Sequence, residues 1–163
     1  MLISGFYLSL IITGESLKGE EHAQVERSIE LLDKAGFAGE AFYLRNFAVF
    51  RGGDNWLNST VPKENAYAAT NFPFAVVTLY PDFFSYTVDE VERAAILLHE
   101  VRHLMGEDET GAYSFVWEHK KNLGWTKNRY HQSIVWKEIR KQTKEYAPNL
   151  FVCEFNDYND CTE

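Results

Sequence analysis

Five consecutive residues of this 163-residue chain have the types and spacing of a metal-binding catalytic site. They are His99-Glu-Val-Arg-His103, within the stretch ILLHEVRHLMGEDETGAYSF (Ile96–Phe115). On a helix, positions four apart share one face, so the two imidazoles can reach one ion. Glu100 would lie beside that ion. Zinc lowers the pKa of a bound water toward about 7, so a neighbouring carboxylate could take its proton.

The helix expected to carry these residues is mostly apolar. Thr87-Val-Asp-Glu90 matches a capping box, and a run without helix breakers follows as far as Gly106. Two histidines on such a helix could also be partly buried polar residues with hydrogen-bond partners of their own. Because a His-Glu-His cluster is costly to bury in an apolar helix, the pattern favours the metal site.

A catalytic zinc site usually has three protein ligands, so a third one must lie elsewhere in the chain. If the motif helix and the next helix form a hairpin that turns at about residues 106–107, Glu109 lies level with His103. Glu118 would lie more than one turn below the ion and is the alternative ligand. The remaining acidic candidates fall in the turn, where acidic residues are solvated or cap the next helix: Glu107 and Asp108.

Hydrolysis of an amide also requires a hydrogen-bond donor for the developing oxyanion. Tyr113 follows Glu109 by one helical turn and would point toward the same site, although most of the nine tyrosines are expected to be packing residues. His131 is a second candidate. Arg102 lies off the ligand face, and we expect it to form a structural ion pair. Two histidines have no pattern around them and are expected at the surface: His22 and His119.

The stretch from Tyr80 to Phe115 resembles the active-site helix of the zincin metallopeptidases, which pair such a helix with a small sheet. The resemblance implies zinc on His99 and His103, with Glu100 as the general base.

The third ligand position separates the zincin clans. Metzincins continue the motif as His-x-x-Gly-x-x-His; here Gly106 keeps the glycine, Glu109 replaces the last histidine, and no downstream methionine supplies a Met-turn. Gluzincins take a glutamate from a following helix, often as Glu-x-x-Ala, which Glu109-Thr-Gly-Ala112 fits with a shorter gap. The spacing HExxHxxGxxE is therefore metzincin-like and the ligand is gluzincin-like, so the clan stays open.

These residues predict a zinc-dependent metallopeptidase that hydrolyses peptide bonds, with water activated by zinc and by Glu100. The alternative is a catalytically inactive zinc-binding module that regulates or binds other proteins. A carboxylate beside an open coordination position favours the enzyme. The sequence does not define a specificity pocket, so peptide, cell-wall and small amide substrates are all compatible with it.

The formal net charge of −8, from 24 acidic and 16 basic residues, argues against nucleic acid or an anionic membrane as a partner. Without repeats or linkers, residues 19–163 are expected to form one domain of the α+β class, with a short sheet on the motif helix. The expected helices cover about 20–35, 87–106, 108–122 and 128–146, the last with Tyr130, Ile134 and Ile139 inward; the expected strands are 41–50 and 74–80, and residues 55–71 are expected to be loop.

The apolar run from Leu2 to Thr13, within residues 1–18, has the length of a signal-peptide core and is too short to span a bilayer. It lacks a basic flank and an Ala-x-Ala site, so a structural strand is the alternative. Cys153 and Cys161 could close a small disulfide or remain free thiols. A disulfide and an export segment would together favour an extracytoplasmic location, with the cytoplasm left open.

Overall fold

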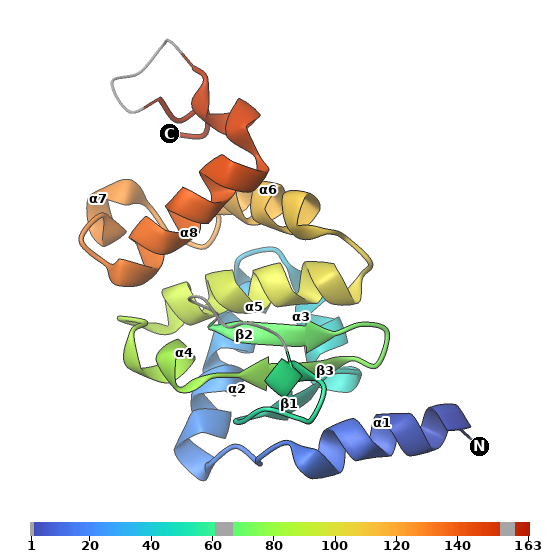
Figure 1. The fold of residues 1–163 in the computed structure, drawn as a ribbon. Helices are drawn as coiled ribbons and strands as arrows, with labels where there is room; N and C mark the ends of the chain where they lie inside the picture. The colour runs from blue at the N-terminus through green and yellow to red at the C-terminus, as the bar shows by residue number, and fades with distance from the viewer. Residues whose placement is uncertain (1, 61–66, 154–158) are drawn as a thin grey trace.

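The computed structural model describes residues 2–60, 67–153 and 159–163. They adopt the expected α+β fold, in which three short strands form one sheet and the other elements are helices (Figure 1). In chain order the elements are α1 (Leu2–Thr13), α2 (Gly19–Lys34), α3 (Ala38–Asn46), β1 (Val49–Arg51), the 3₁₀ helix η1 (Asn58–Thr60), β2 (Ala68–Asn71), β3 (Val76–Leu79), α4 (Pro81–Ser85), α5 (Glu90–Leu104), α6 (Glu109–His119), α7 (Lys127–Tyr130), α8 (Ile134–Tyr146) and the 3₁₀ helix η2 (Pro148–Phe151).

The sheet has the order β1-β3-β2, with β3 parallel to β1 and antiparallel to β2. All four residues of β3 are buried, as its mostly apolar sequence predicts for a strand buried on both faces. The strand β2 is therefore an edge strand, and its register with β3 pairs Thr70 with Val77 and Asn71 with Val76.

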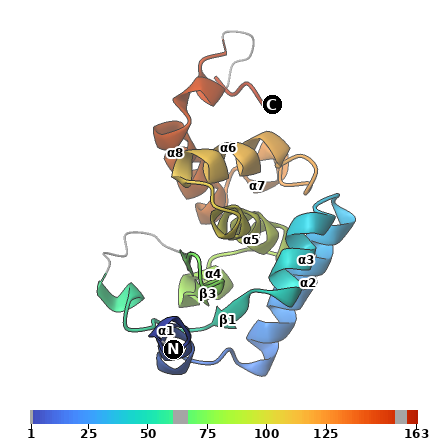
Figure 2. The ribbon, with the colours of Figure 1, turned by 90° about the vertical axis from the view of Figure 1, so that its right-hand side faces the viewer.

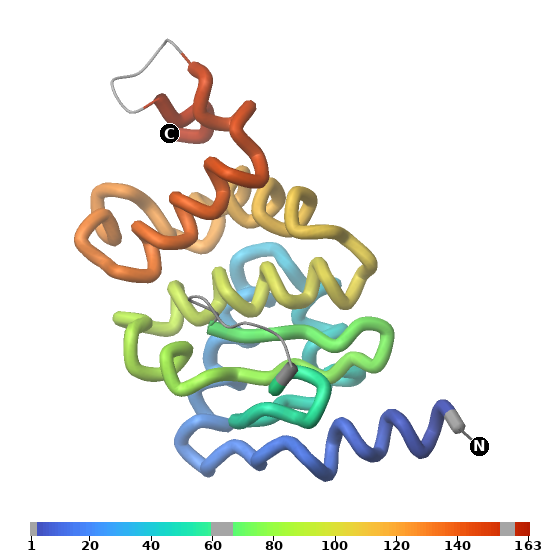
Figure 3. The backbone as a smooth tube through the Cα atoms, in the orientation of Figure 1, coloured from blue at the N-terminus to red at the C-terminus, as the bar shows by residue number. Residues whose placement is uncertain are grey.

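The helix α5 lies between the sheet and a second layer that contains α6 and α8 (Figures 1 and 2). The expected packing of the sheet on the motif helix is confirmed, since α5 contacts β2. The chain reverses direction sharply between α5 and α6, so these two helices form the expected hairpin (Figure 3).

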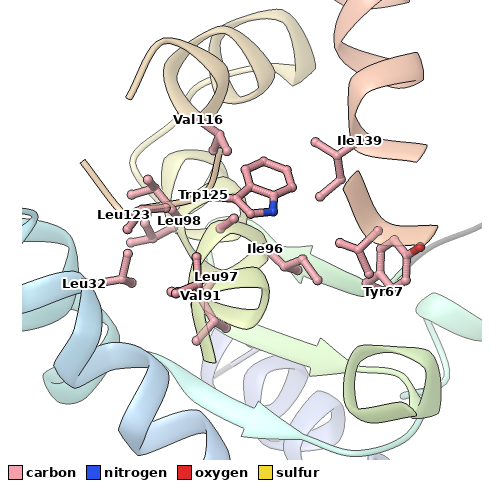
Figure 4. Close-up of a cluster of buried hydrophobic side chains, with 14 of the residues drawn as sticks. Leu32, Tyr67, Val91, Ile96, Leu97, Leu98, Val116, Leu123, Trp125 and Ile139 are labelled. Atoms are coloured by element: carbon pink, nitrogen blue, oxygen red, sulfur yellow. The ribbon is translucent and has the colours of Figure 1, made fainter. Parts of the chain in front are cut away.

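Most side chains of α5 are buried, because the helix is enclosed by elements on several sides. Leu97 and Leu98 lie in the main apolar cluster, together with Leu32 of α2 and Val116 of α6 (Figure 4). Burial of one such aliphatic side chain stabilises a fold by about 1.5–3 kcal/mol. The motif helix is therefore rigidly held by the core, and the few polar residues on it must have partners or a function.

The prediction of a strand over residues 41–50 is wrong, because most of this segment belongs to α3 and only the end of it forms β1. Ala41 and Leu44 are buried at helical spacing, in contact with the core that α2 and α5 also form. The aromatic residues that suggested a strand pack on each other instead: the rings of Phe42 and Phe47 lie 6.0 Å apart. Burial of one helical face thus outweighs the strand propensity of these residues.

Residues 55–71 were expected to be loop, but they include η1 and the edge strand β2. The sequence of β2, Ala-Ala-Thr-Asn, has no aromatic residue and only one β-branched residue, so it lacks the composition that marks strands. Its end is fixed by buried amides, since Asn71 donates to Asn58 at 2.8 Å and accepts from Asn55 at 2.7 Å. Such side-chain hydrogen bonds leave no periodic signal in the sequence.

The termini of several helices also differ from the prediction. Asp89 rather than Thr87 is the N-cap of α5, because its carboxylate accepts the backbone N–H groups of Val91 and Glu92. The single helix expected over 128–146 is divided into α7 and α8, and Ser133 caps the second of them. As expected, Tyr130 and Ile139 are buried, but Ile134 at the start of α8 is 49% exposed.

The apolar segment near the N-terminus forms the helix α1, so the alternative of a strand is wrong. Leu10 of this helix is fully buried, and the ring of Phe6 contacts Trp56 and Phe74 at 5.4 and 5.0 Å. Within the described part of the chain, no helix combines the length and the apolar character needed to cross a membrane.

Cys153 and Cys161 form a disulfide, which confirms the expected pairing and contradicts the free-thiol alternative. The disulfide lies beside a buried anchor of the C-terminal segment, where Asp160 accepts a hydrogen bond from the indole of Trp117 at 3.0 Å.

Candidate metal centre

The turn between α5 and α6 brings the two parts of the candidate site together. Gly106 adopts a φ of +93°, a backbone conformation that residues with a Cβ rarely adopt. Its N–H bonds the carbonyl of His103 at 2.9 Å, and the next N–H, of Glu107, bonds the carbonyl of Arg102 at 3.0 Å. This pair of bonds is the Schellman motif that ends helices at a glycine. The chain then turns back at once, and Glu109 becomes the first residue of α6.

Three side-chain atoms converge at this turn. The Nε2 atoms of His99 and His103 lie 3.0 Å apart, and Oε2 of Glu109 lies 3.3 Å from the first and 3.4 Å from the second. Within the part of the chain that the structure describes, these three residues have ligand atoms close enough together to hold a metal ion. The structure thus brings together the three residues that the sequence analysis selected as ligands.

The spacing of these atoms can be compared with that of metal ligands. Two ligand atoms at about 2.0–2.1 Å from a tetrahedral zinc ion lie about 3.3 Å from each other. The three observed distances, 3.0, 3.3 and 3.4 Å, are close to this value. Two imidazole nitrogens and a carboxylate oxygen are also a donor set that zinc favours. The residues present therefore fit a zinc ion with three protein ligands.

The electrostatics of the metal-free site show how strongly the three groups interact. Burial by itself would lower the pKa of His103, but the hydrogen bonds to Glu109 and to the Glu107 carbonyl, with the charges of Glu100 and Glu109, raise it to about 9. Hydrogen bonds from His103 and His99 hold the pKa of Glu109 well below its ordinary value. A proton on His103 thus occupies the region that a cation would fill.

The second nitrogen of each histidine has a different environment. Nδ1 of His103 lies 2.9 Å from the backbone carbonyl of Glu107, which can only accept, so this nitrogen carries a hydrogen. In the neutral ring Nε2 is then the unprotonated, metal-binding nitrogen, as in many protein metal sites. Nδ1 of His99 is buried without a hydrogen-bond partner among the described residues, and its ring instead lies 4.3 Å from the ring of Tyr113.

Glu100, the expected general base, is 5% exposed and lines the same cleft as the three ligand residues. Thr70 of the edge strand β2 donates a hydrogen bond of 2.7 Å to its Oε2 atom. The charge of Glu100 contributes to the raised pKa values of both His103 and Tyr113. The hydrogen bond from Thr70 therefore attaches this carboxylate to the edge strand, in the cleft that the three candidate ligands also line.

The cleft has a volume of about 670 Å³ and lies between the two layers of the molecule. The strand β2 forms one wall and α8 the other, while α5 and α6 contribute the ligands. Apolar and aromatic side chains lie around the polar centre, and they include Phe72, Ile139 and Tyr146. A volume of about 300–1,000 Å³ is typical of sites for small molecules and short peptide segments.

Tyr113 lines the cleft next to His99, but its hydroxyl already has a partner. It donates a hydrogen bond of 2.7 Å to Oε1 of Gln142 on α8, and its ring stacks on Tyr146 at 5.2 Å. Burial, followed by the charges of Glu109 and Glu100, raises the pKa of the Tyr113 phenol above its ordinary value. The phenol therefore stays protonated, and Tyr113 and Gln142 form a linked pair at the α8 side of the cleft.

The other candidates for ligands lie outside the metal group. Glu118 is exposed on α6, Asp108 caps α6 by accepting from the N–H of Gly111, and the side chain of Glu107 pairs with Arg102. Arg102 also pairs with Glu40 at 3.0 Å, so the expectation of a structural ion pair is confirmed.

The other histidines do not join the site. His131 is exposed and is not among the residues that line the cleft, although it was the second candidate for the oxyanion donor. His22 is exposed, as expected. His119 is only partly exposed, because its ring packs on Phe37 and Phe115, with centroids 6.1 and 4.3 Å away.

Three features of the site were not found in the sequence: Thr70, Gln142 and the backbone carbonyl of Glu107. Thr70 belongs to a strand without a strand-like sequence, and Gln142 lies 29 positions after the tyrosine that it bonds. The backbone carbonyl of Glu107 could not be identified from residue type, because every residue has such a group. A hairpin model of α5 and α6 could have suggested it, since Glu107 lies directly after the glycine of the turn.

The chain has no significant match among protein-family models, curated proteins or solved structures. The geometry and the chemistry of the site are therefore the basis on which a function is assigned.

Proposed function

We propose that this protein is a zinc-dependent metallopeptidase of the zincin type, with His99, His103 and Glu109 as the zinc ligands. The observation that carries the proposal is the triangle of three ligand atoms with sides of 3.0, 3.3 and 3.4 Å, in one cleft with a buried glutamate. A structural zinc site is normally closed by four protein ligands, whereas three ligands leave a position for chemistry.

Zinc supplies two effects when it is bound: it lowers the pKa of water toward about 7, and it polarises a carbonyl group. The residues of the chain supply the remaining steps. Glu100 takes a proton from the attacking water and delivers it to the leaving amine, as a general base and then a general acid. The hydrogen bond from Thr70 fixes Oε2 of this carboxylate and leaves Oε1 to meet the water.

A donor for the oxyanion is supplied by Tyr113 and Gln142 together. Since the Tyr113 hydroxyl donates to Oε1 of Gln142, the amide NH₂ group of Gln142 keeps its hydrogens for a ligand. If the amide turned over, its NH₂ group would bond the phenol oxygen, and the phenol hydrogen would become available instead. In either arrangement the pair can offer one N–H or O–H donor to the cleft.

A peptide is the substrate class that the cleft suits best. The strand β2 lines the cleft and, among the described residues, forms ladder bonds with β3 alone. An extended peptide can add to such an edge through backbone hydrogen bonds. The charged residues of the lining include Glu100, Glu107 and Glu109, so neutral or basic segments would be favoured over acidic ones. The disulfide is consistent with an extracytoplasmic site of action.

The replacement Glu100→Gln tests this function. It keeps the size of the side chain and the acceptor for Thr70, but it removes the group that takes the proton. We expect one zinc per chain in the variant, as in the parent, and a loss of peptide hydrolysis of about 10³-fold. The measurement is cleavage of a fluorogenic peptide library by both zinc-loaded proteins, with Glu118→Gln, an exposed carboxylate on α6, as the matched control.

Equal hydrolysis by the parent and Glu100→Gln would contradict the assigned mechanism. A parent that binds zinc but cleaves no member of the library would instead favour the inactive zinc-binding module.

A further inference from the structure

We propose that Arg102 is a positioning residue of the metal centre, which acts through Glu107 on the orientation of His103. The inference rests on the zinc centre of the proposed function, but it does not depend on peptide hydrolysis. It extends the role of Arg102 beyond that of an ion pair between helices.

The first step is the two-point contact between Arg102 and Glu107. Nε of Arg102 donates to Oε2 of Glu107 at 3.0 Å, and Nη2 donates to Oε1 of the same carboxylate. A planar guanidinium that meets both oxygens of a carboxylate fixes its direction as well as its distance. Only 18% of the Arg102 side chain is exposed, so solvent competes weakly for these bonds.

The second step is the backbone of Glu107 itself. Its carbonyl oxygen lies 2.9 Å from Nδ1 of His103, and its N–H bonds the carbonyl of Arg102 at 3.0 Å. Glu107 is therefore held at its side chain and at its N–H by Arg102, while its C=O orients the imidazole. Through this hydrogen bond the neutral ring is kept in the tautomer that leaves Nε2 free for a metal ion.

The third step concerns what keeps Arg102 itself in place. Nη1 donates to Glu40 of α3 at 3.0 Å, and the guanidinium lies 4.0 Å from the centre of the Phe115 ring of α6. The cation is thus stacked on an aromatic ring and anchored to a third helix. Because these contacts fix the guanidinium independently of the turn, its hydrogen bonds to Glu107 can hold the turn in place.

The turn matters for a second ligand, because Glu109 lies two residues after Glu107. A shift of the turn would move the Glu109 carboxylate and the His103 imidazole together, and the 3.4 Å spacing between their ligand atoms depends on both. The role is therefore geometric, and a lysine, which lacks the planar fork, should fill it only in part.

The test is the zinc affinity of Arg102→Met, measured by competition with a chelator. A positive charge near a metal site weakens cation binding, so its removal should strengthen zinc binding if charge alone mattered. The positioning role predicts the opposite, a dissociation constant about tenfold higher, since outer-shell partners are worth about 10–100-fold in affinity. Arg102→Lys should lie between the variant and the parent.

Arg45→Met is the matched control, because it also replaces an arginine that pairs two helices, here with Asp33 at 2.8 Å between α2 and α3, and neither residue lines the cleft. We expect its zinc affinity to stay within about twofold of the parent, well below the about 10–100-fold effect of an outer-shell partner. Circular dichroism and thermal unfolding of the metal-free proteins establish that each variant folds. If Arg102→Met does not fold, Glu107→Ala decides the matter, with the same expected loss of affinity.

Zinc binding by Arg102→Met that is as tight as in the parent, or tighter, would overturn the inference. So would an equal loss of affinity in Arg45→Met, since the effect would then be one of general stability. A parent that binds no zinc would overturn both the inference and the proposed function. A parent that binds zinc without cleaving peptides would contradict the peptidase alone.

Discussion

The side-chain atoms of His99, His103 and Glu109 that could bind a metal ion lie close together. In the metal-free protein the raised pKa of His103 keeps a proton on its ring, and the lowered pKa of Glu109 keeps its carboxylate charged. In the metal-free chain this arrangement is an ion pair between the carboxylate and the protonated imidazole of His103, with His99 as a further hydrogen-bond partner. An ion that displaces the proton keeps the same attractive contacts. The three side chains are consequently arranged before any metal binds, and the proposed site predicts that each of them would contribute strongly to metal affinity.

Replacement of the third ligand tests this view at the residue scale. In Glu109→Gln the side chain keeps its shape but loses the charge that both imidazoles face. We expect zinc affinity to fall by at least about 100-fold, since even outer-shell partners are worth about 10–100-fold. Glu118→Gln changes the same charge on the same helix, but at an exposed position outside the metal group, and should bind zinc as the parent does.

Chelator competition on the two variants gives the comparison. A larger loss in Glu118→Gln than in Glu109→Gln would show that the wrong glutamate has been assigned.

The residues of the candidate metal group were predictable from the sequence, while the residues that support them were not. His99, Glu100 and His103 follow from local helical spacing, and Glu109 follows from the geometry of a helical hairpin. Thr70 and Gln142 reach the site through tertiary contacts with β2 and α8, and a sequence without an alignment contains no signal for such contacts.

At the scale of elements, the reversal between α5 and α6 decides whether the third ligand meets the other two. Gly106 makes this reversal possible with its φ of +93°. The same kind of glycine ends α2, where Gly36 has a φ of +98°, but Gly36 does not line the cleft. The two glycines therefore have the same backbone conformation and different positions relative to the site.

The variants Gly106→Ala and Gly36→Ala distinguish an effect of backbone strain on stability from an effect of the turn on zinc binding. Each places a Cβ in the left-handed region, and each should lower the free energy of unfolding by about 1 kcal/mol. Only Gly106→Ala should also weaken zinc binding, because only its turn carries Glu107 and Glu109. Thermal unfolding and zinc titration measure the two effects. Equal zinc affinity in both variants would show that the turn does not position the ligand.

Helices and strands with a clear hydrophobic pattern in the sequence were predicted better than those that depend on contacts with other parts of the fold. The helices α2, α5 and α6 and the buried strand β3 agree with the sequence pattern, as does the hairpin. Residues 41–50 were expected to form a strand because they are rich in aromatic and β-branched residues, whereas the burial of Ala41 and Leu44 on one helical face is seen only in the structure. The strand β2 has only four residues, and its pairing with β3 rather than its composition makes it a strand.

At the scale of the whole molecule, α5 lies between the sheet and the helical layer (Figure 1). The residues that line the cleft come from both layers and from α5 itself. This position explains why the polar motif can lie on so apolar a helix. One face of α5, between Ala95 and His103, lines the cleft, while most of the remaining side chains are buried in the core. The net charge of −8 adds a general attraction for cations, including metal ions.

The state of His103 makes zinc binding dependent on pH. Its folded, metal-free pKa of about 9 is above the ordinary value of 6.5, so the proton stabilises the metal-free fold below pH 6.5, and this stabilisation is lost as the pH rises through 9. Zinc needs the deprotonated ring, so its affinity should rise with pH by up to about tenfold per unit below pH 9. A histidine with an ordinary pKa would show little change above pH 7.

Calorimetric titration of the parent chain with zinc at pH 7.0, 7.5 and 8.0 examines the metal centre most directly. We expect one zinc per chain, released protons, and an affinity that increases at each step, because the proton on His103 must leave before zinc can occupy the position between His99, His103 and Glu109. A folded chain that takes up no zinc across this range, or that binds it without releasing protons, would contradict the assigned centre.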